Sequence, residues 1–214
     1  MTATPSERGD LEERLRRADA AALGELFDLH RPRLWRVVNF RFDGRLVGRV
    51  DVDDVLQEAY LAALKRIEHY GQDGFVSPFL WLRAVVQQTL IDVHRRHLGA
   101  AMRNAGKDVS IFGRYPQATS ASLAVHLVGD WTSPSQAAAR GELLDKVQAA
   151  IASMSEMDQE VLALRHFEEL TNSEVAATLG IEPKAASIRY VRAIRRLKEM
   201  LSAFPGAFSE RQDG

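Results

Sequence analysis

Apolar residues recur at helical spacing along most of the chain, without the strict alternation that a half-buried strand needs. The first pattern, from Leu11 to Phe27, predicts one amphipathic helix, and Pro32 suits the first turn of a second. A third helix is predicted to follow Asp51, and a fourth to begin at Pro78 with Ser77 as its cap. We therefore expect a helical bundle in the N-terminal half.

The helical pattern fails between residues 106 and 135, where Gly, Ser, Thr and Pro accumulate, and it resumes near Gln136. This composition predicts a linker, although several of its side chains are more apolar than a solvated tether needs. The expected fold is all-α, with a four-helix bundle at residues 11–105 and a second helical domain at residues 136–205. A flexible linker at residues 106–135 joins them.

The stretch from Thr171 to Pro183 predicts a helix-turn-helix. Thr171 and Glu174 have the spacing of a capping box, which satisfies free amides at a helix start. Gly180 can adopt the left-handed conformation that ends a helix, and Pro183 suits the first turn of the next. Ala176 is small enough to let the two helices approach closely.

The second helix of this motif is strongly basic, and two interpretations compete. Its cations can be solvated residues that flank an apolar stripe, or they can meet DNA, because such a helix enters the major groove. The stripe would consist of Ile188, Val191, Ile194, Leu197 and Leu201. We favour DNA, with Lys184 and Ser187 at base edges, Ile188 beside them, and Arg189, Arg192 and Arg196 near phosphates.

Four carboxylates gather at the start of the third predicted helix: Asp51, Asp53, Asp54 and Glu58. They can cap the helix, face solvent, or bind a protein together with Gln57. A further interpretation is a metal-dependent hydrolase, but a helical metal site needs further inward-facing ligands, and the sequence offers no such set. We expect no metal and no cofactor.

Aromatic and basic residues surround the start of the fourth predicted helix. Aromatic rings stack on unpaired bases and cations bind phosphates, so this mixture suits single-stranded nucleic acid. The candidate residues are Tyr70, Phe75, Arg83, Gln88, Arg95 and Arg96. Phe79 and Trp81 are expected in the core.

Amino-acid composition restricts the possible functions of the protein only slightly. Lys and Arg number 28 against 29 Asp and Glu, so attraction to nucleic acid must come from local charge. The chain has no Cys, which fits a reducing compartment and excludes disulfides. No stretch has the length of a membrane span and the N-terminus lacks a signal-peptide pattern, so we expect a cytoplasmic protein.

Three segments in order resemble bacterial RNA polymerase sigma factors of the extracytoplasmic-function group. "DVDDVLQEAY" is similar to the group's D-x-x-D-L-x-Q-E, and "FLWLRAVVQQTLID" to its W-L-x-x-I-A-x-N-x-x-x-D. The third segment, "LTNSEVAATLGIEPKAASIRYVRAIRRLK", resembles region four. Where relatives have S-x-G-T-V-K-S-R after the turn, this chain retains only Arg189, and Ile188 replaces a Ser.

The resemblance implies a function and partners. Asp51, Asp54, Gln57 and Glu58 would bind core RNA polymerase, and the aromatic and basic residues above would recognise and melt the minus-ten promoter element on the non-template strand. The second domain would read the duplex minus-thirty-five element, and an anti-sigma factor would be a further partner. The protein would not be an enzyme. The alternative is a helix-turn-helix regulator with a helical sensor or dimerisation domain.

Overall fold

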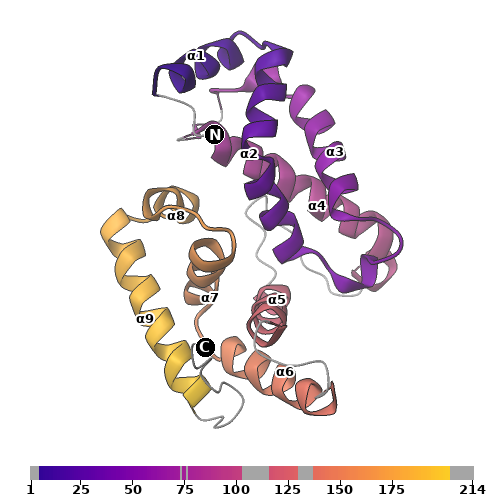
Figure 1. Cartoon of the computed structure of the whole chain (residues 1–214), viewed down its shortest axis with the longest axis vertical. Coiled ribbons are helices and arrows are strands. Elements are labelled where there is room, and N and C mark those ends of the chain that lie inside the picture. The colour runs from indigo at the N-terminus through magenta and orange to yellow at the C-terminus, as the bar shows by residue number, and fades with distance from the viewer. Residues whose placement is uncertain (1–4, 73, 76, 103–115, 130–136, 203–214) are drawn as a thin grey trace, which may run out of the picture. The chain divides into compact units, whose positions relative to one another are not determined.

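The computed structural model describes residues 5–72, 74–75, 77–102, 116–129 and 137–202 (Figure 1). Every regular element within these ranges is a helix, which confirms the predicted all-α fold. The chain divides into two compact units, Met1–Ile111 and Phe112–Gly214. None of the helices that the structure describes is long and apolar enough to span a membrane.

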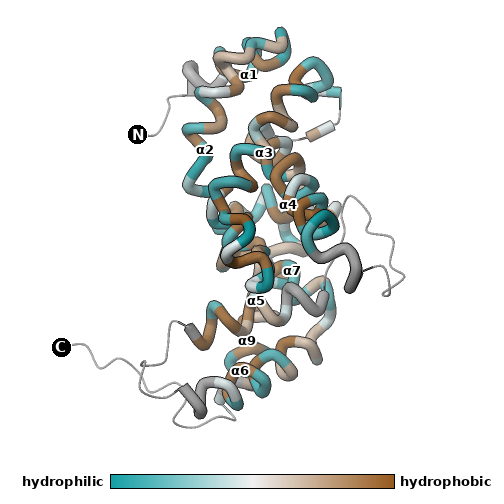
Figure 2. Tube along the Cα trace, turned by 90° about the vertical axis from the view of Figure 1, so that its right-hand side faces the viewer, coloured by the Kyte–Doolittle hydropathy of each residue, from teal (hydrophilic) through white to brown (hydrophobic). Residues whose placement is uncertain are grey.

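The described part of the first unit contains four α-helices and two short 3₁₀ turns. The helices are α1 (Pro5–Arg16), α2 (Ala20–Arg41), α3 (Val52–Leu64) and α4 (Pro78–Met102), and the turns are η1 (Gly44–Leu46) and η2 (Ile67–His69). Helices α2, α3 and α4 pack pairwise against one another, while α1 packs on α2 and η2. Hydrophobic and hydrophilic residues interchange in short runs along these helices, as amphipathic packing requires (Figure 2).

The start of this unit differs from the sequence prediction in two ways. The expected helix from Leu11 to Phe27 is broken, because Ala18 adopts a left-handed φ of 59°. Asp19 then caps α2, accepting hydrogen bonds from the amides of Ala21 (2.8 Å) and Ala22 (3.3 Å). Pro32 does not begin a helix but lies inside α2.

Helix α2 continues through Pro32 because tertiary packing outweighs one missing hydrogen bond. Proline removes the donor that would bond the Asp28 carbonyl. Both residues are exposed, so this carbonyl lies on the solvent side of the helix. The opposite side is buried on both sides of the proline, at Leu23, Leu26, Leu34, Val37 and Val38.

Residues 116–129 and 137–202 of the second unit form five α-helices. They are α5 (Pro116–Gly129), α6 (Ala137–Ala152), α7 (Glu156–Leu162), α8 (Asn172–Leu179) and α9 (Pro183–Ser202), with a π-helical turn, η5 (Ala163–Phe167), after α7. Helix α5 packs mainly on α6, and α9 packs on both α7 and α8. Ile151, Leu162, Leu164 and Leu170 are among the fully buried side chains of this unit.

Part of the predicted linker is helical. Residues 116–129 form α5, which buries Leu123, Ala124, Leu127 and Val128. Their burial explains part of the apolar content that was too high for a solvated linker. Residues 106–115 and 130–135 of the predicted linker lie outside the described residues.

The predicted helix-turn-helix is confirmed in detail. The Thr171 hydroxyl accepts from the Glu174 amide (3.2 Å), and the Glu174 carboxylate accepts from the Thr171 amide (2.8 Å). Gly180 ends α8 at φ 64° and ψ 37°. The Ile181 amide then reaches back to the Ala176 carbonyl (3.0 Å), as in a Schellman turn.

The turn makes a testable prediction about glycine. Gly180→Ala forces a Cβ into a left-handed conformation and is expected to lower the free energy of unfolding by about 1 kcal/mol, although no atom obstructs the methyl group. Gly141→Ala is the matched control. Gly141 is exposed inside α6 with an ordinary φ, so alanine there is expected to stabilise by about 0.5–1 kcal/mol. Urea unfolding followed by circular dichroism measures both, and the same sign for the two variants would contradict this account.

Candidate protein-binding and nucleic-acid-binding surfaces

The start of α3 is fixed by a reciprocal capping box between two aspartates. The Asp54 amide donates to Asp51 Oδ1 (2.8 Å), and the Asp51 amide donates to Asp54 Oδ2 (3.0 Å). Both carboxylates are exposed, so each also presents negative charge to solvent. Capping and a role in binding a partner are therefore compatible at these two positions.

The other two carboxylates of this segment bind arginines on neighbouring helices. Asp53 Oδ1 lies 2.9 Å from Arg31 Nη2 on α2. The two carboxylate oxygens of Glu58 each accept a hydrogen bond from Arg96 on α4, at 3.0 Å. The Arg96 guanidinium holds the pKa of Glu58 below its ordinary value, despite the opposing effect of partial burial. The structure thus joins a predicted polymerase-binding residue to a predicted DNA-binding residue.

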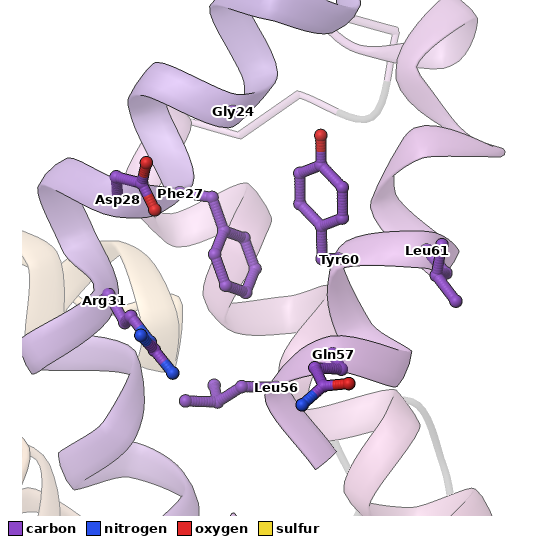
Figure 3. A pocket seen from close by; sticks show the side chains of 8 residues that line it. All are labelled: Gly24, Phe27, Asp28, Arg31, Leu56, Gln57, Tyr60 and Leu61. Carbon is purple, nitrogen blue, oxygen red and sulfur yellow. The ribbon is translucent and has the colours of Figure 1, made fainter. Parts of the chain in front are cut away.

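A pocket of about 450 Å³ lies between α2 and α3 (Figure 3). The rings of Phe27 and Tyr60 meet edge to face in it, with centroids 5.3 Å apart. Its lining residues are Gly24, Phe27, Asp28, Arg31, Leu56, Gln57, Tyr60 and Leu61. Gln57 therefore lies beside an apolar recess. The sequence pattern did not reveal this recess because its residues come from two helices whose packing was unknown.

The hydrolase interpretation finds no support at this site. Asp51 and Asp54 cap a helix, and Asp53 and Glu58 pair with arginines. Across the described part of the chain, no three His, Cys, Asp or Glu side chains are grouped as metal ligands. Two of these carboxylates therefore cap α3, and the other two attach it to α2 and α4.

The aromatic cluster before α4 divides into a buried part and an exposed part. Trp81 and Phe79 are buried, as predicted. Tyr70 is half-buried and packs edge to face on Trp81, with centroids 5.2 Å apart, and burial raises the pKa of its hydroxyl. Phe75 is exposed and presents its ring to solvent.

Helix α4 separates the predicted basic residues onto different faces. Arg83 does not lie on the surface: it is only 4% exposed and donates to Gln87 Oε1 (3.0 Å). The reason is its spacing, which places it on the same stripe as the buried Phe79, Val86 and Leu90. Expecting Arg83 to bind DNA from this position was wrong.

The remaining candidates on α4 lie near one another. Gln88 Nε2 donates to Asp92 Oδ1 (3.2 Å), and Arg95 Nη1 lies 4.0 Å from the same oxygen. Spacings of four and seven residues place Gln88, Asp92 and Arg95 on one face of the helix. Arg95 and Arg96 are both exposed.

The buried side of helix α9 differs from the apolar stripe that the sequence suggested. Ala186, Ala193 and Leu197 are buried, whereas Ile188 and Val191 of the predicted apolar stripe are 43% and 54% exposed. Small alanines face the core because α8 and α7 pack closely on α9. Of the predicted apolar stripe, Leu197 is buried, whereas Ile188 and Val191 are exposed, so the stripe is only partly confirmed.

The outward face of α9 combines these two apolar residues with basic and polar ones. Its exposed residues include Lys184, Ser187, Ile188, Val191, Arg192, Arg195 and Lys198, with one acidic residue, Glu199, towards the end of the helix. Arg195 was missed as a candidate, although it falls eleven residues, or three turns, after Lys184. Among the described residues, no hydrogen bond or ion pair engages Lys184, Arg192 or Arg195.

Two of the arginines predicted to contact phosphates bind other residues of the second unit. Arg189 Nη1 lies 3.8 Å from Asp158 Oδ1 of α7, and Arg196 Nη2 donates to the Ser153 carbonyl (3.1 Å). A third cation, Arg165, lies over the ring of Tyr190 at 5.3 Å. These contacts hold α9 against the rest of the unit and help fix which face it turns outward.

Comparison with protein families identifies both units. The family model described as Sigma-70 region 2 matches residues 26–98, and the one described as Sigma-70, region 4 matches residues 144–197. The first match spans α3 and most of α4, and the second contains α7, α8 and most of α9.

Whole-length comparisons agree with these matches. The sigma factor ShbA of Streptomyces griseus is 28% identical over 90% of this chain and 94% of its own length. SigD of Mycobacterium tuberculosis is 27% identical over 86% of this chain and 79% of its own. Both are described as ECF RNA polymerase sigma factors. A solved structure of CnrH in complex with the cytosolic domain of CnrY has a similar fold, with a TM-score of 0.51 and 22% identity, covering 92% of this chain and 98% of that one.

The contact between Glu58 and Arg96 predicts a pH dependence. A lowered pKa in the folded protein means that the pair stabilises above the ordinary Glu pKa of about 4.3, and that this contribution is lost as the pH falls through the folded value. Arg96→Met should raise the Glu58 pKa toward its ordinary value. The substitution should cost less than about 1 kcal/mol of unfolding free energy at pH 7, because the pair is so exposed, and this cost should vanish once the pH lies below the folded pKa of Glu58.

Carboxyl-carbon NMR titration measures this pKa directly. Arg95→Met is the matched control, because Arg95 is adjacent in sequence but pairs with Asp92. An unchanged Glu58 pKa in Arg96→Met, or an equal rise in both variants, would contradict the assignment.

Proposed function

The chain belongs to the extracytoplasmic-function group of sigma-70 factors, non-catalytic proteins that direct RNA polymerase to promoters, and on this premise we propose how its residues divide the work. The first unit binds core polymerase and opens the minus-ten element. The second unit docks on the duplex minus-thirty-five element. The observation that carries the proposal is the two-sided α9, with small buried residues on one face and a basic outward face on the other. The alternative, a helix-turn-helix regulator with a sensor or dimerisation domain, does not explain why the first unit matches Sigma-70 region 2.

The polymerase-binding surface is the first half of α3. Asp51, Asp54 and Gln57 are exposed there, and Glu58 is partly exposed. The adjacent pocket, with exposed Leu61 at its edge, offers apolar area beside this charge. A partner helix with one basic side and one apolar side fits both features. The surface ion pair of Glu58 with Arg96 is weak enough for such a partner to displace.

The minus-ten surface combines the exposed ring of Phe75 and the partly exposed ring of Tyr70 with the polar face of α4. An unpaired base can stack on Phe75, and Arg95 can bind a neighbouring phosphate. Gln88 and Arg96 supply further hydrogen-bond donors, both already ordered by carboxylates. Arg83 is excluded from this surface because it is buried.

The minus-thirty-five surface is the outward face of α9. Lys184 and Ser187 lie in its first turns, the part of a recognition helix that reaches base edges. Arg192 and Arg195 take the phosphate contacts. Arg189 and Arg196 act chiefly by holding α9 on the unit, because both have partners there.

Two further assignments follow from the family. CnrH is solved with the cytosolic domain of CnrY, and this supports an anti-sigma partner for the present chain too. Because sigma factors act on polymerase in the bacterial cytoplasm, the chain is expected there. The domain division of residues 11–105 and 136–205 is kept, with α5 added to the second domain because it packs on α6.

Asp54 offers a test of polymerase binding that separates charge from capping. Asp54→Asn keeps an oxygen that can accept from the Asp51 amide, so it should retain stability yet weaken binding to core polymerase about tenfold. Asp54→Ala should lose the same affinity and also about 1 kcal/mol of stability. Affinity is measured by titrating labelled chain with core polymerase, and stability by thermal unfolding.

The matched control is Asp53→Asn, the same change of charge one residue earlier on a carboxylate paired with Arg31. It should leave polymerase affinity nearly unchanged. Equal losses for Asp53→Asn and Asp54→Asn would show a general charge effect, and failure of the wild-type chain to bind core polymerase would remove the proposal.

Substitutions on α9 should separate specificity from affinity. Lys184→Ala or Ser187→Ala should cost about 1–3 kcal/mol on the preferred upstream sequence and relax specificity there. Arg192→Ala should weaken binding to all sequences alike and lower the salt slope by about one. Holoenzyme binding to a promoter and its upstream point variants, at several salt concentrations, measures this. A changed sequence preference in Arg192→Ala would show that these contacts are wrongly sorted.

A further inference from the structure

Ile188 and Val191 are large apolar side chains that the fold leaves on the surface of α9. They are 43% and 54% exposed, while the alanines of the same helix fill the core. Burial within the described part of the second unit therefore does not explain their apolar character. Position 188 is also one of several at which the chain departs from the family motif, which has a Ser there.

These two residues lie in the middle of a cationic strip. Lys184, Ile188, Val191 and Arg195 follow one another at spacings of four, three and four residues, so they line up along one side of the helix. Ser187 and Arg192 flank them. A partner that covers the strip must therefore offer negative charge around a small apolar contact.

Duplex DNA has this chemistry in its major groove. Phosphates line the groove, and the thymine methyl is the apolar group that the base pairs present on its floor. Ile188 and Val191 are about 4.5 Å apart along the helix axis, comparable with one or two base steps of about 3.4 Å. Helix α9 is the second helix of a region-four helix-turn-helix, the element that enters this groove.

We propose that Ile188 and Val191 read thymine methyl groups in the upstream promoter element, and so supply specificity that Lys184 and Ser187 do not. This inference rests on the proposed function of α9. It adds an apolar contribution to base recognition, and it predicts that the preferred element carries thymine beside the bases contacted from Lys184. Each methyl contact is expected to contribute about a two- to fourfold preference.

The test removes only the methyl group. Duplexes bound by the full chain with core polymerase are first selected from a random library, and the selected upstream element is resynthesised with deoxyuridine in place of each thymidine in turn. At one or two positions, deoxyuridine should weaken wild-type binding about two- to fourfold. The Ile188→Ala and Val191→Ala variants should each lose sensitivity at one position.

Val125→Ala is the matched control for Val191→Ala. Val125 is 51% exposed in the same unit but lies on α5, so the same loss of volume there should leave the deoxyuridine effect unchanged. Equal unfolding temperatures of the two variants would show that a lost response does not come from misfolding.

Three results would overturn the inference while leaving minus-thirty-five recognition intact. The selected element could lack thymine, deoxyuridine could have no effect on wild type, or both alanine variants could respond as wild type does. If Ile188 and Val191 instead cover a second copy of the chain, sedimentation would show a dimer that Val191→Ala weakens, with the deoxyuridine effect unaltered, which also overturns it. Selection that yields no upstream element at all would reject the proposed function itself.

Discussion

The burial of Ala186, Ala193 and Leu197 on one side of α9 is the constraint on which the second unit depends. These residues pack toward α7 and α8, and the left-handed turn at Gly180 fixes how α9 leaves α8. With that side held, the opposite side must face outward with Lys184 and Arg195 on it. The direction of the basic face therefore follows from packing, and the contacts of Arg189 and Arg196 reinforce it.

In the first unit, charged side chains fix the position of α3. A capping box fixes where α3 begins, and pairs with Arg31 and Arg96 attach its acidic first half to α2 and α4. Exposed ion pairs of this kind contribute little to stability, so an incoming partner can exchange them at small cost. The acidic segment can thus be ordered in the free protein and still be available to polymerase. Because Arg96 lies on α4, which also carries Gln88 and Arg95, the surfaces that we propose for polymerase and for minus-ten DNA share one ion pair.

Sequence reasoning succeeded where structure is decided locally. The capping box at Thr171, the cap at Ser77 and the turn at Gly180 each depend on a few adjacent residues and were predicted, whereas capping by Asp51 and Asp54 was one of several alternatives. It failed where packing decides. Pro32 lies within α2 because a continuous buried stripe outweighs one lost hydrogen bond.

The errors on α9, α4 and α5 have related causes. Alanine carries little hydrophobic signal, so the burial of Ala186 and Ala193 was not predicted, and the alternative interpretation of α9 placed the larger Ile188 and Val191 in its apolar stripe instead. Arg83 was placed on the surface by its charge, although its spacing from Phe79 placed it inside. Residues 116–129 are rich in Ser, Thr and Ala, which concealed the short stripe that α5 buries.

A footprint of the reconstituted holoenzyme on a selected promoter tests the central claim most directly. The account predicts two protected blocks. Replacing Lys184, Arg192 and Arg195 together by alanine should remove the upstream block and leave core polymerase binding intact, because these side chains face away from the buried side of α9. An upstream block that survives this triple substitution would show that the outward face of α9 does not meet the duplex, and would contradict the account.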